Sequence, residues 1–265
     1  MLTKTEKRFY DGYYSIFNCA ISALLFYIRM IRREVPDPIA RKQAVVPVLL
    51  GVVSLIVSFI LLLAISLLAG KLGFQIGNVQ NPVVRALLSA FFAAGLVEEL
   101  AKLLFILLSI RIFRSKNLYE YILTGYAVGM GFALLEEFLY AGGMVTIVRL
   151  FTFALHSVFG IIMAKHLGMA RYNRRNGSGS VAGETIKAIV LPMLLHTVYD
   201  ACTVSNPVLQ SLDTLGEQAE SAEFIFLLVG IVAMIGYAIW QFVVLARVKK
   251  NAEKYSSMGM FYMFE

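Results

Sequence analysis

The stretch VVRALLSAFFAAGLVEELAKLLFILLSI, residues 83–110, decides the fold class of this chain. Apart from Arg85, its only charges are Glu98, Glu99 and Lys102. The run is longer than the roughly 20 apolar residues that cross a bilayer as a helix. A charge at the centre of a bilayer costs at least about 2.5 kcal/mol on insertion scales. Helix packing does not require that cost, so these charges indicate chemistry or transport.

The composition of the whole chain is that of an integral membrane protein. Of its 265 residues 59% are hydrophobic, and the mean hydropathy is +0.74. A closed β-barrel is excluded because the apolar runs are continuous rather than alternating. The sequence therefore predicts an all-α fold, a polytopic transmembrane bundle with about 6–8 membrane-associated helices.

Six apolar stretches are long enough, or nearly so, to cross the membrane. They are residues 45–69, 83–110, 121–141, 146–165, 187–204 and 224–246. We expect an N-terminal membrane-associated segment with a cytosolic linker over 1–44, an integral domain over 45–250 and a cytosolic tail over 251–265. Residues 13–28 are either a seventh span or an interfacial helix, and the sequence leaves both open.

The connecting segments alternate in charge. Segments 29–42, 111–120, 165–187 and the tail are basic, whereas 205–223 has four acids and no base. This pattern predicts that the basic segments face the cytosol, and it explains the net charge of +7 without a nucleic-acid partner. No cleaved signal peptide is expected. The two cysteines form neither a disulfide framework nor a metal motif.

Four of the predicted spans carry ionisable groups. They are Glu98, Glu99 and Lys102 on the second, Glu136 and Glu137 on the third, His156 on the fourth, and His196 and Asp200 on the fifth. Residues four apart share a helix face, which aligns Glu98 with Lys102, Phe132 with Glu136, and His196 with Asp200. Each group has a structural interpretation, such as a buried ion pair or a packed histidine. Together they favour one functional site.

The residue types suit hydrolysis. Glu98 held beside a water could act as a general base, and a histidine opposite could stabilise an oxyanion or protonate a leaving amine. The sequence has no obvious Ser–His–Asp set and no HExxH zinc motif. A glutamate and two histidines from separate helices could still bind zinc, so metal dependence stays open.

Four motifs resemble those of the PrsW family of intramembrane proteases. Glu98-Glu99-Leu100-Ala101-Lys102 resembles its EExxK motif. Phe132 to Glu136, preceded by Gly129 and Gly131, resembles its FxxxE motif. Arg149 to His156 and His196 to Asp200 resemble its third and fourth motifs. The family is distantly similar to the CAAX prenyl proteases and the bacteriocin-processing CPBP proteins. Lys102, Glu136 and Asp200 depart from the prenyl protease pattern, so a prenyl-protein substrate is not expected.

The resemblance implies a multi-pass protein of the bacterial cytoplasmic membrane. It implies cleavage of a single-span membrane protein such as an anti-sigma factor, on the extracytoplasmic side, in envelope-stress signalling. The implied catalytic residues are Glu98, Glu99, Glu136, His156 and His196, supported by Lys102, Phe132, Arg149 and Asp200.

Within this set we expect Glu98 to be the base, with Glu136 and His156 positioning the water or the carbonyl. We expect His196, supported by Asp200, to be the oxyanion donor or proton shuttle. No cofactor is favoured. If zinc is bound, the expected ligands are Glu98, Glu136, His156 and His196.

Two other functions fit buried carboxylates and histidines. A proton or ion transporter could use them as a relay, but such proteins often have inverted repeats, and the sequence has no convincing internal symmetry. A catalytically inactive membrane scaffold would not need a near-complete set of motifs.

Overall fold

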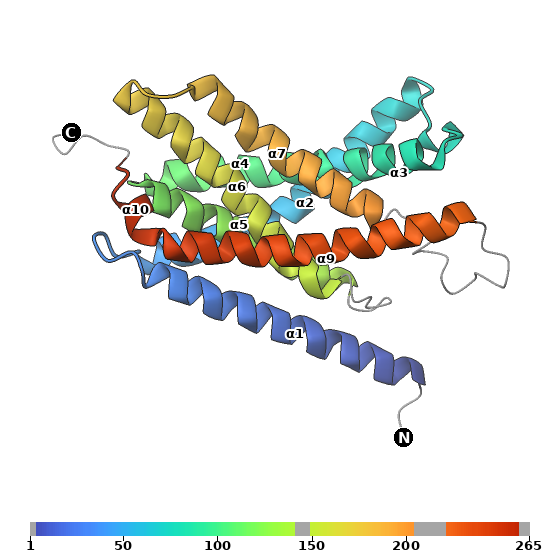
Figure 1. The fold of residues 1–265 in the computed structure, drawn as a ribbon, viewed down its shortest axis with the longest axis horizontal. Helices are drawn as coiled ribbons and strands as arrows, with labels where there is room; N and C mark the ends of the chain where they lie inside the picture. The colour runs from blue at the N-terminus through green and yellow to red at the C-terminus, as the bar shows by residue number, and fades with distance from the viewer. Residues whose placement is uncertain (1–3, 141–148, 204–220, 260–265) are drawn as a thin grey trace.

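The chain folds into a bundle of long helices, seen in a computed structural model that describes residues 4–140, 149–203 and 221–259 (Figure 1). The helices are α1 (Lys4–Ile31), α2 (Arg41–Lys71), α3 (Pro82–Ala90), α4 (Val97–Phe113), α5 (Leu118–Tyr140), α6 (Arg149–Asn176), α7 (Val181–Cys202), α9 (Ser221–Lys250) and α10 (Ala252–Ser256). Over the described residues there is no strand, only an isolated bridge between Asn117 and Gly259. The predicted all-α fold is confirmed.

Five helices are long and apolar enough to cross a membrane: Arg41–Lys71, Leu118–Tyr140, Thr152–Asn176, Val181–Cys202 and Leu228–Lys250. Each contains most of one predicted span, and most extend beyond it into charged residues. Residues 13–28 belong to α1, whose shorter stretch Ile16–Ile31 is apolar. The predicted acidic loop 205–223 lies mostly outside the described residues.

The predicted span 83–110 is not one continuous α-helix. Asn81 caps the start of α3 by accepting hydrogen bonds from the backbone N–H groups of Val83 and Val84. A π turn, η2 (Phe91–Gly95), then separates α3 from α4. The hydrogen bond from Leu96 N to Phe91 O marks the wider turn. An apolar run carries no signal for such a turn, so the sequence predicted a single helix here.

The core lies where α5 meets α6 and α2. Nearly every residue of α5 from Leu118 to Ala133 is buried. Its glycines allow backbones to approach closely, as expected for small residues between membrane helices. A Cβ on Gly129 would lie 2.3 Å from His156 O on α6, and one on Gly131 would lie 1.9 Å from Val48 O on α2. These contacts fix α5 and α6 in a register that positions the motif residues.

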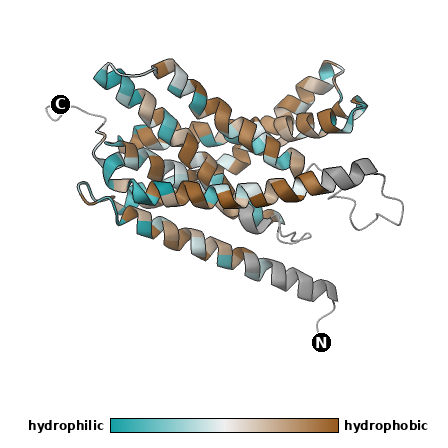
Figure 2. Ribbon diagram, viewed as in Figure 1, coloured by the Kyte–Doolittle hydropathy of each residue, from teal (hydrophilic) through white to brown (hydrophobic). Residues whose placement is uncertain are grey.

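The predicted basic segments gather at one end of the bundle. Figure 2 shows hydrophilic residues where α1 joins α2, where α6 joins α7 and around α10. Glu34 of segment 29–42 links it to segment 111–120 and to the tail, because its carboxylate accepts hydrogen bonds from Asn117 and Ser256. Burial raises the pKa of Glu34. A shared basic end is what the positive-inside pattern requires.

Candidate active site

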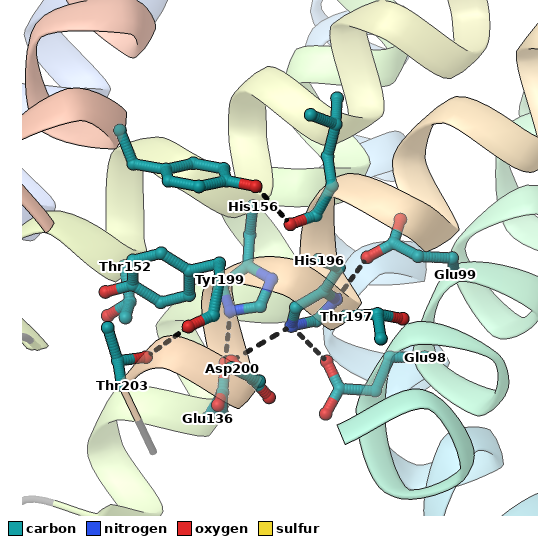
Figure 3. A network of polar contacts seen from close by, with 12 residues as sticks. Glu98, Glu99, Glu136, Thr152, His156, His196, Thr197, Tyr199, Asp200 and Thr203 are labelled. Carbon is teal, nitrogen blue, oxygen red and sulfur yellow. Dashed lines mark hydrogen bonds and ion pairs between the residues drawn. The ribbon is translucent and has the colours of Figure 1, made fainter. Parts of the chain in front are cut away.

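A cavity of about 190 Å³ lies where α2, η2, α4, α5, α6 and α7 converge. The residues that line it include Glu98, Glu136, His156, His196 and Asp200. Figure 3 shows these side chains pointing toward one another from separate helices. The structure therefore brings together the residues that the motifs singled out, although up to 102 positions separate them along the chain.

Glu98 lies at the wall of this cavity with one oxygen lacking a hydrogen bond. Its Oε2 is buried and has no hydrogen-bond partner among the described residues. Two basic side chains lie within 4.0 Å of it, with Lys102 Nζ at 3.7 Å and His196 Nε2 at 3.9 Å. A buried carboxylate oxygen without a donor is costly. Such a group is suited to bind a water or another small polar ligand.

Lys102 pairs mainly with Glu99, its i,i+3 neighbour, although Glu98 at i,i+4 also shares its helix face. Lys102 Nζ donates to Glu99 Oε1 at 2.6 Å, and both side chains are fully buried. The ammonium also lies 4.1 Å from the centroid of the Phe132 ring, a cation–π contact. Phe132 of the second motif therefore contacts the first motif directly.

His196 is held by Glu99 as well. Its Nδ1 lies 2.7 Å from Glu99 Oε1. Because a carboxylate only accepts hydrogen bonds, we assign the proton to Nδ1, which leaves Nε2 toward the cavity. Asp200, the predicted partner, is farther away, with 3.7 Å between its Oδ1 and Nε2. Glu99 is thus the principal carboxylate that orients His196.

His156 has the opposite arrangement of its ring nitrogens. Lys102 Nζ lies 3.0 Å from Nδ1. An ammonium group only donates, so Nδ1 accepts and Nε2 carries the proton. That Nε2 lies 2.6 Å from Glu136 Oε2. One lysine therefore fixes the tautomer of His156 and neutralises Glu99, which orients His196.

The π turn explains how Glu98 and Glu99 reach these partners. π turns inside α-helices often occur at functional sites because they change the direction of the following side chains. Here the turn ends at Gly95, three residues before the first of the two glutamates. A Cβ on Gly95 would lie 2.1 Å from Thr197 Oγ1 and 2.8 Å from Met193 O. Gly95 thus lets α4 approach α7 at the turn before His196.

We expect Gly95→Ala to disturb this site. The added methyl group would push η2 away from α7, costing about 1–3 kcal/mol as overpacking does. That outweighs the gain in helix propensity of about 1 kcal/mol. Thermal unfolding in detergent should show a lower midpoint, and proteolytic activity should fall with it. Gly70→Ala on α2 is the control, because a Cβ there meets nothing within 4 Å. Equal behaviour of both variants would contradict the role of Gly95.

The remaining candidates differ in their places. Glu137 is buried and accepts a hydrogen bond from Thr152 Oγ1, while Glu136 contacts His156. The two neighbours thus point to different partners, as their helical spacing predicts. Arg149 is the first residue of α6, and its side chain lies outside the described residues.

One aromatic contact in the site was not predicted. The ring of Phe159 lies over His196, with 5.2 Å between centroids and an angle of 33° between planes. Phe159 is three residues after His156 and shares its helix face. That spacing is the only sequence signal for it, and an apolar residue at such a spacing is usually core.

The donor atoms of three residues could hold a metal ion. One atom each from Glu98, His156 and His196 lies within 4.8 Å of the others. Two histidines and a glutamate are also a ligand set of catalytic zinc sites. Residue types and spacing therefore fit zinc.

Comparisons with known proteins give the family of this chain. The family model described as PrsW family intramembrane metalloprotease matches residues 41–235. Protease PrsW of Halalkalibacterium halodurans is 30% identical over 130 residues, which are 47% of this chain and 57% of that protein. Protease PrsW of Bacillus subtilis is 31% identical over 118 residues, 42% of this chain and 52% of that protein.

The chain spans little more than half the length of these curated relatives. No solved structure matches it. The matched region of the family model contains α2 to α7 and all the cavity residues named above. The chain belongs to the PrsW family.

Proposed function

We propose that this protein is an intramembrane endopeptidase that cleaves a single-span membrane protein, such as an anti-sigma factor. The observation that carries the proposal is the buried Glu98 Oε2, which lacks a hydrogen bond and faces His196 across the cavity. Membership of the family supports peptide hydrolysis. Five helices able to span a membrane support a multi-pass protein. The Bacillus-type relatives support the bacterial cytoplasmic membrane.

The proposed reaction begins with a water between Glu98 and His196. The 3.9 Å between Glu98 Oε2 and His196 Nε2 leaves room for one water hydrogen-bonded to both atoms. Glu98 as a carboxylate takes one proton from this water, and the hydroxide oxygen bonds to the carbon of the scissile carbonyl. When the carbon–nitrogen bond breaks, Glu98 returns the proton to the leaving amine. Glu98 is regenerated and one water is consumed.

The oxyanion needs a donor on the other side of the cavity. His156 Nε2 carries a proton because Lys102 occupies Nδ1. This N–H contacts Glu136 and can turn its hydrogen bond toward the substrate oxygen. A preorganised donor of this kind is worth about 10²–10³ in rate. Glu99 and Lys102 act by fixing the two histidines.

Extracytoplasmic cleavage is supported by the position of the site in the bundle. The basic end lies at the start of α2 and the end of α4, whereas the cavity lies at η2 and the start of α4. From Glu98 to Arg111 the helix rises about 20 Å at 1.5 Å per residue. The cavity is therefore far from the predicted cytosolic face.

A zinc-dependent peptidase is the second candidate, because the family is described as metalloproteases and the donor set fits. Glu98, His156 and His196 would hold the ion. A bound zinc ion would supply a Lewis acid and lower the pKa of a water. One contact favours the metal-free reaction. Lys102 donates to His156 Nδ1, so the lone pair of Nε2 is replaced by a proton.

We therefore expect the active protein to be independent of metal. Protein purified in mild detergent should contain no near-stoichiometric zinc by mass spectrometry, and 1,10-phenanthroline should leave its proteolysis unchanged. His156→Gln should not alter the metal content. One zinc per chain, lost in that variant and required for cleavage, would establish the metallopeptidase instead.

Co-expression tests the proposed function directly. The chain is expressed in a bacterium with a panel of single-span anti-sigma factors carrying tags at both ends. A shortened, membrane-retained fragment that depends on the protein supports the proposal. Absence of a fragment with the whole panel, for protein present in the membrane, contradicts it.

A further inference from the structure

Beside the cavity at Glu98 lies a second one that the reaction does not use. The second cavity has a volume of about 350 Å³ and shares Leu62 of α2 and Ala93 of η2 with the first. Ala93 is exposed and Leu62 half-buried, so both side chains border open space. The second cavity is therefore a groove that adjoins the catalytic cavity at Leu62 and Ala93.

The groove runs along α2, away from the predicted cytosolic end. After Leu62 it is lined on α2 by Ile65, Ser66 and Ala69, and it closes near Phe74 and Ile76 beyond the end of that helix. In Figure 1 the C-terminal half of α2 diverges from α3, and the groove lies between them. At its far end Phe74 contacts Phe92, with 6.3 Å between ring centroids.

The lining is mostly apolar and combines large aliphatic and aromatic side chains with small ones. Alanines and serines lie on both walls, and Ser66 and Ser89 are the polar residues that border the second cavity. No charged side chain lines it within the described part of the chain. Such a surface suits an apolar peptide segment and excludes a charged one, because an unpaired charge there would lose its hydration.

We propose that this groove holds the substrate segment between the scissile bond and the outer membrane face, in an extended conformation. The inference rests on the proposed function, because the groove can hold a substrate only if the residues at its inner end cleave one. Proteolysis requires an accessible peptide carbonyl, which a helix hides in its own hydrogen bonds. An unwound segment of the substrate would lie in the groove, beside the catalytic residues.

The length of the groove sets how much substrate it holds. From Leu62 to Ala69 the helix rises about 10 Å. An extended chain advances about 3.3 Å per residue, so about three substrate residues lie along this wall. The junction at Leu62 and Ala93 contacts the residue beside the scissile bond. We infer that this substrate residue is uncharged, because no charged side chain lines the groove within the described residues.

Ala93→Phe tests the groove because a phenyl ring at the junction would separate the two cavities. We expect cleavage of the tagged anti-sigma factor to fall at least about tenfold, equivalent to about 1.4 kcal/mol of lost substrate interaction. Ala64→Phe is the matched control, since Ala64 is also exposed, lies on α2 and lines neither cavity. It should cleave like the unmodified protein. Thermal unfolding in detergent confirms that both variants fold.

A photo-crosslink gives a second, independent readout. p-Benzoylphenylalanine replaces Ser66 or, as the control, Ala64, in a Glu98→Gln background that retains uncleaved substrate. Irradiation should join the tagged anti-sigma factor to position 66 and not to position 64.

The outcomes separate this inference from the proposed function. If the unmodified protein cleaves no member of the panel, the proposed function fails and the groove assignment fails with it. If it cleaves, but Ala93→Phe cleaves equally well or both positions crosslink alike, the groove assignment alone is overturned. Loss of cleavage in Ala93→Phe together with a crosslink from position 66 supports it.

Discussion

Glu98→Gln abolishes proteolysis while the protein stays folded: this is the largest effect on activity that we expect. A glutamine keeps the shape of the side chain but cannot take a proton from water. A positioned general base contributes about 10²–10⁴ in rate, so cleavage should fall by at least about 100-fold. Stability should be unchanged or higher, because the substitution replaces a buried carboxylate that lacks a hydrogen bond at Oε2 with a neutral amide. The measurement is fragment yield in co-expression, with thermal unfolding of the purified variant.

Glu120→Gln is the matched control for this substitution. Glu120 is also a buried acid on a membrane helix, but it accepts hydrogen bonds from Gln43 and the backbone N–H of Lys116 at the basic end. Glu120 does not line the cavity. Its replacement should leave cleavage nearly intact. Retained cleavage in Glu98→Gln, or equal loss in both variants, would remove Glu98 from the role of base.

The expected effects of Glu98→Gln on activity and on stability distinguish a catalytic residue from a structural one. When a residue that serves packing or ion pairing is replaced, the protein loses stability and activity together. When a catalytic residue in an unfavourable environment is replaced, the protein loses activity, and its stability is unchanged or higher. Glu98 has the unfavourable environment of a catalytic residue, whereas Lys102 and Glu99 form a buried ion pair of the structural kind.

Hydropathy was sufficient to predict most of the fold. Apolar runs of the required length predicted the helices α2, α5, α6, α7 and α9, because a membrane leaves the backbone few alternatives to a helix. The π turn at Phe91–Gly95 could not be predicted in this way. At this turn Gly95 packs against Thr197 on α7, a contact between residues 102 positions apart that no local pattern predicts.

The sequence predicted which residues form the site, but not which of them contact one another. Charges in apolar spans and their spacing identified Glu98, Glu136, His156 and His196. Helical spacing allows Lys102 to meet either Glu98 or Glu99, since i,i+3 and i,i+4 neighbours are both close. The choice of Glu99 depends on His196, which contacts the same oxygen from another helix. Tertiary contacts of this kind leave no periodic pattern in a sequence.

Lys102→Met should produce the largest loss of stability in the chain. Lys102 is fully buried, donates to Glu99 at 2.6 Å and contacts His156 at 3.0 Å. Without it, the fully buried Glu99 keeps His196 as its one hydrogen-bond partner among the described residues. Removing one member of a buried ion pair costs about 3–5 kcal/mol, because the other charge remains uncompensated. The free energy of unfolding in mixed detergent micelles measures this loss.

The double variant Lys102→Met with Glu99→Gln separates a structural ion pair from a functional one. With both charges removed, stability should return close to that of the unmodified protein, as it often does when a buried pair is replaced as a unit. Cleavage should stay low, because no ammonium group then holds the tautomer of His156. If cleavage recovers together with stability, the pair only maintains the fold. If stability recovers alone, Lys102 is the group through which the first motif positions the histidines for catalysis.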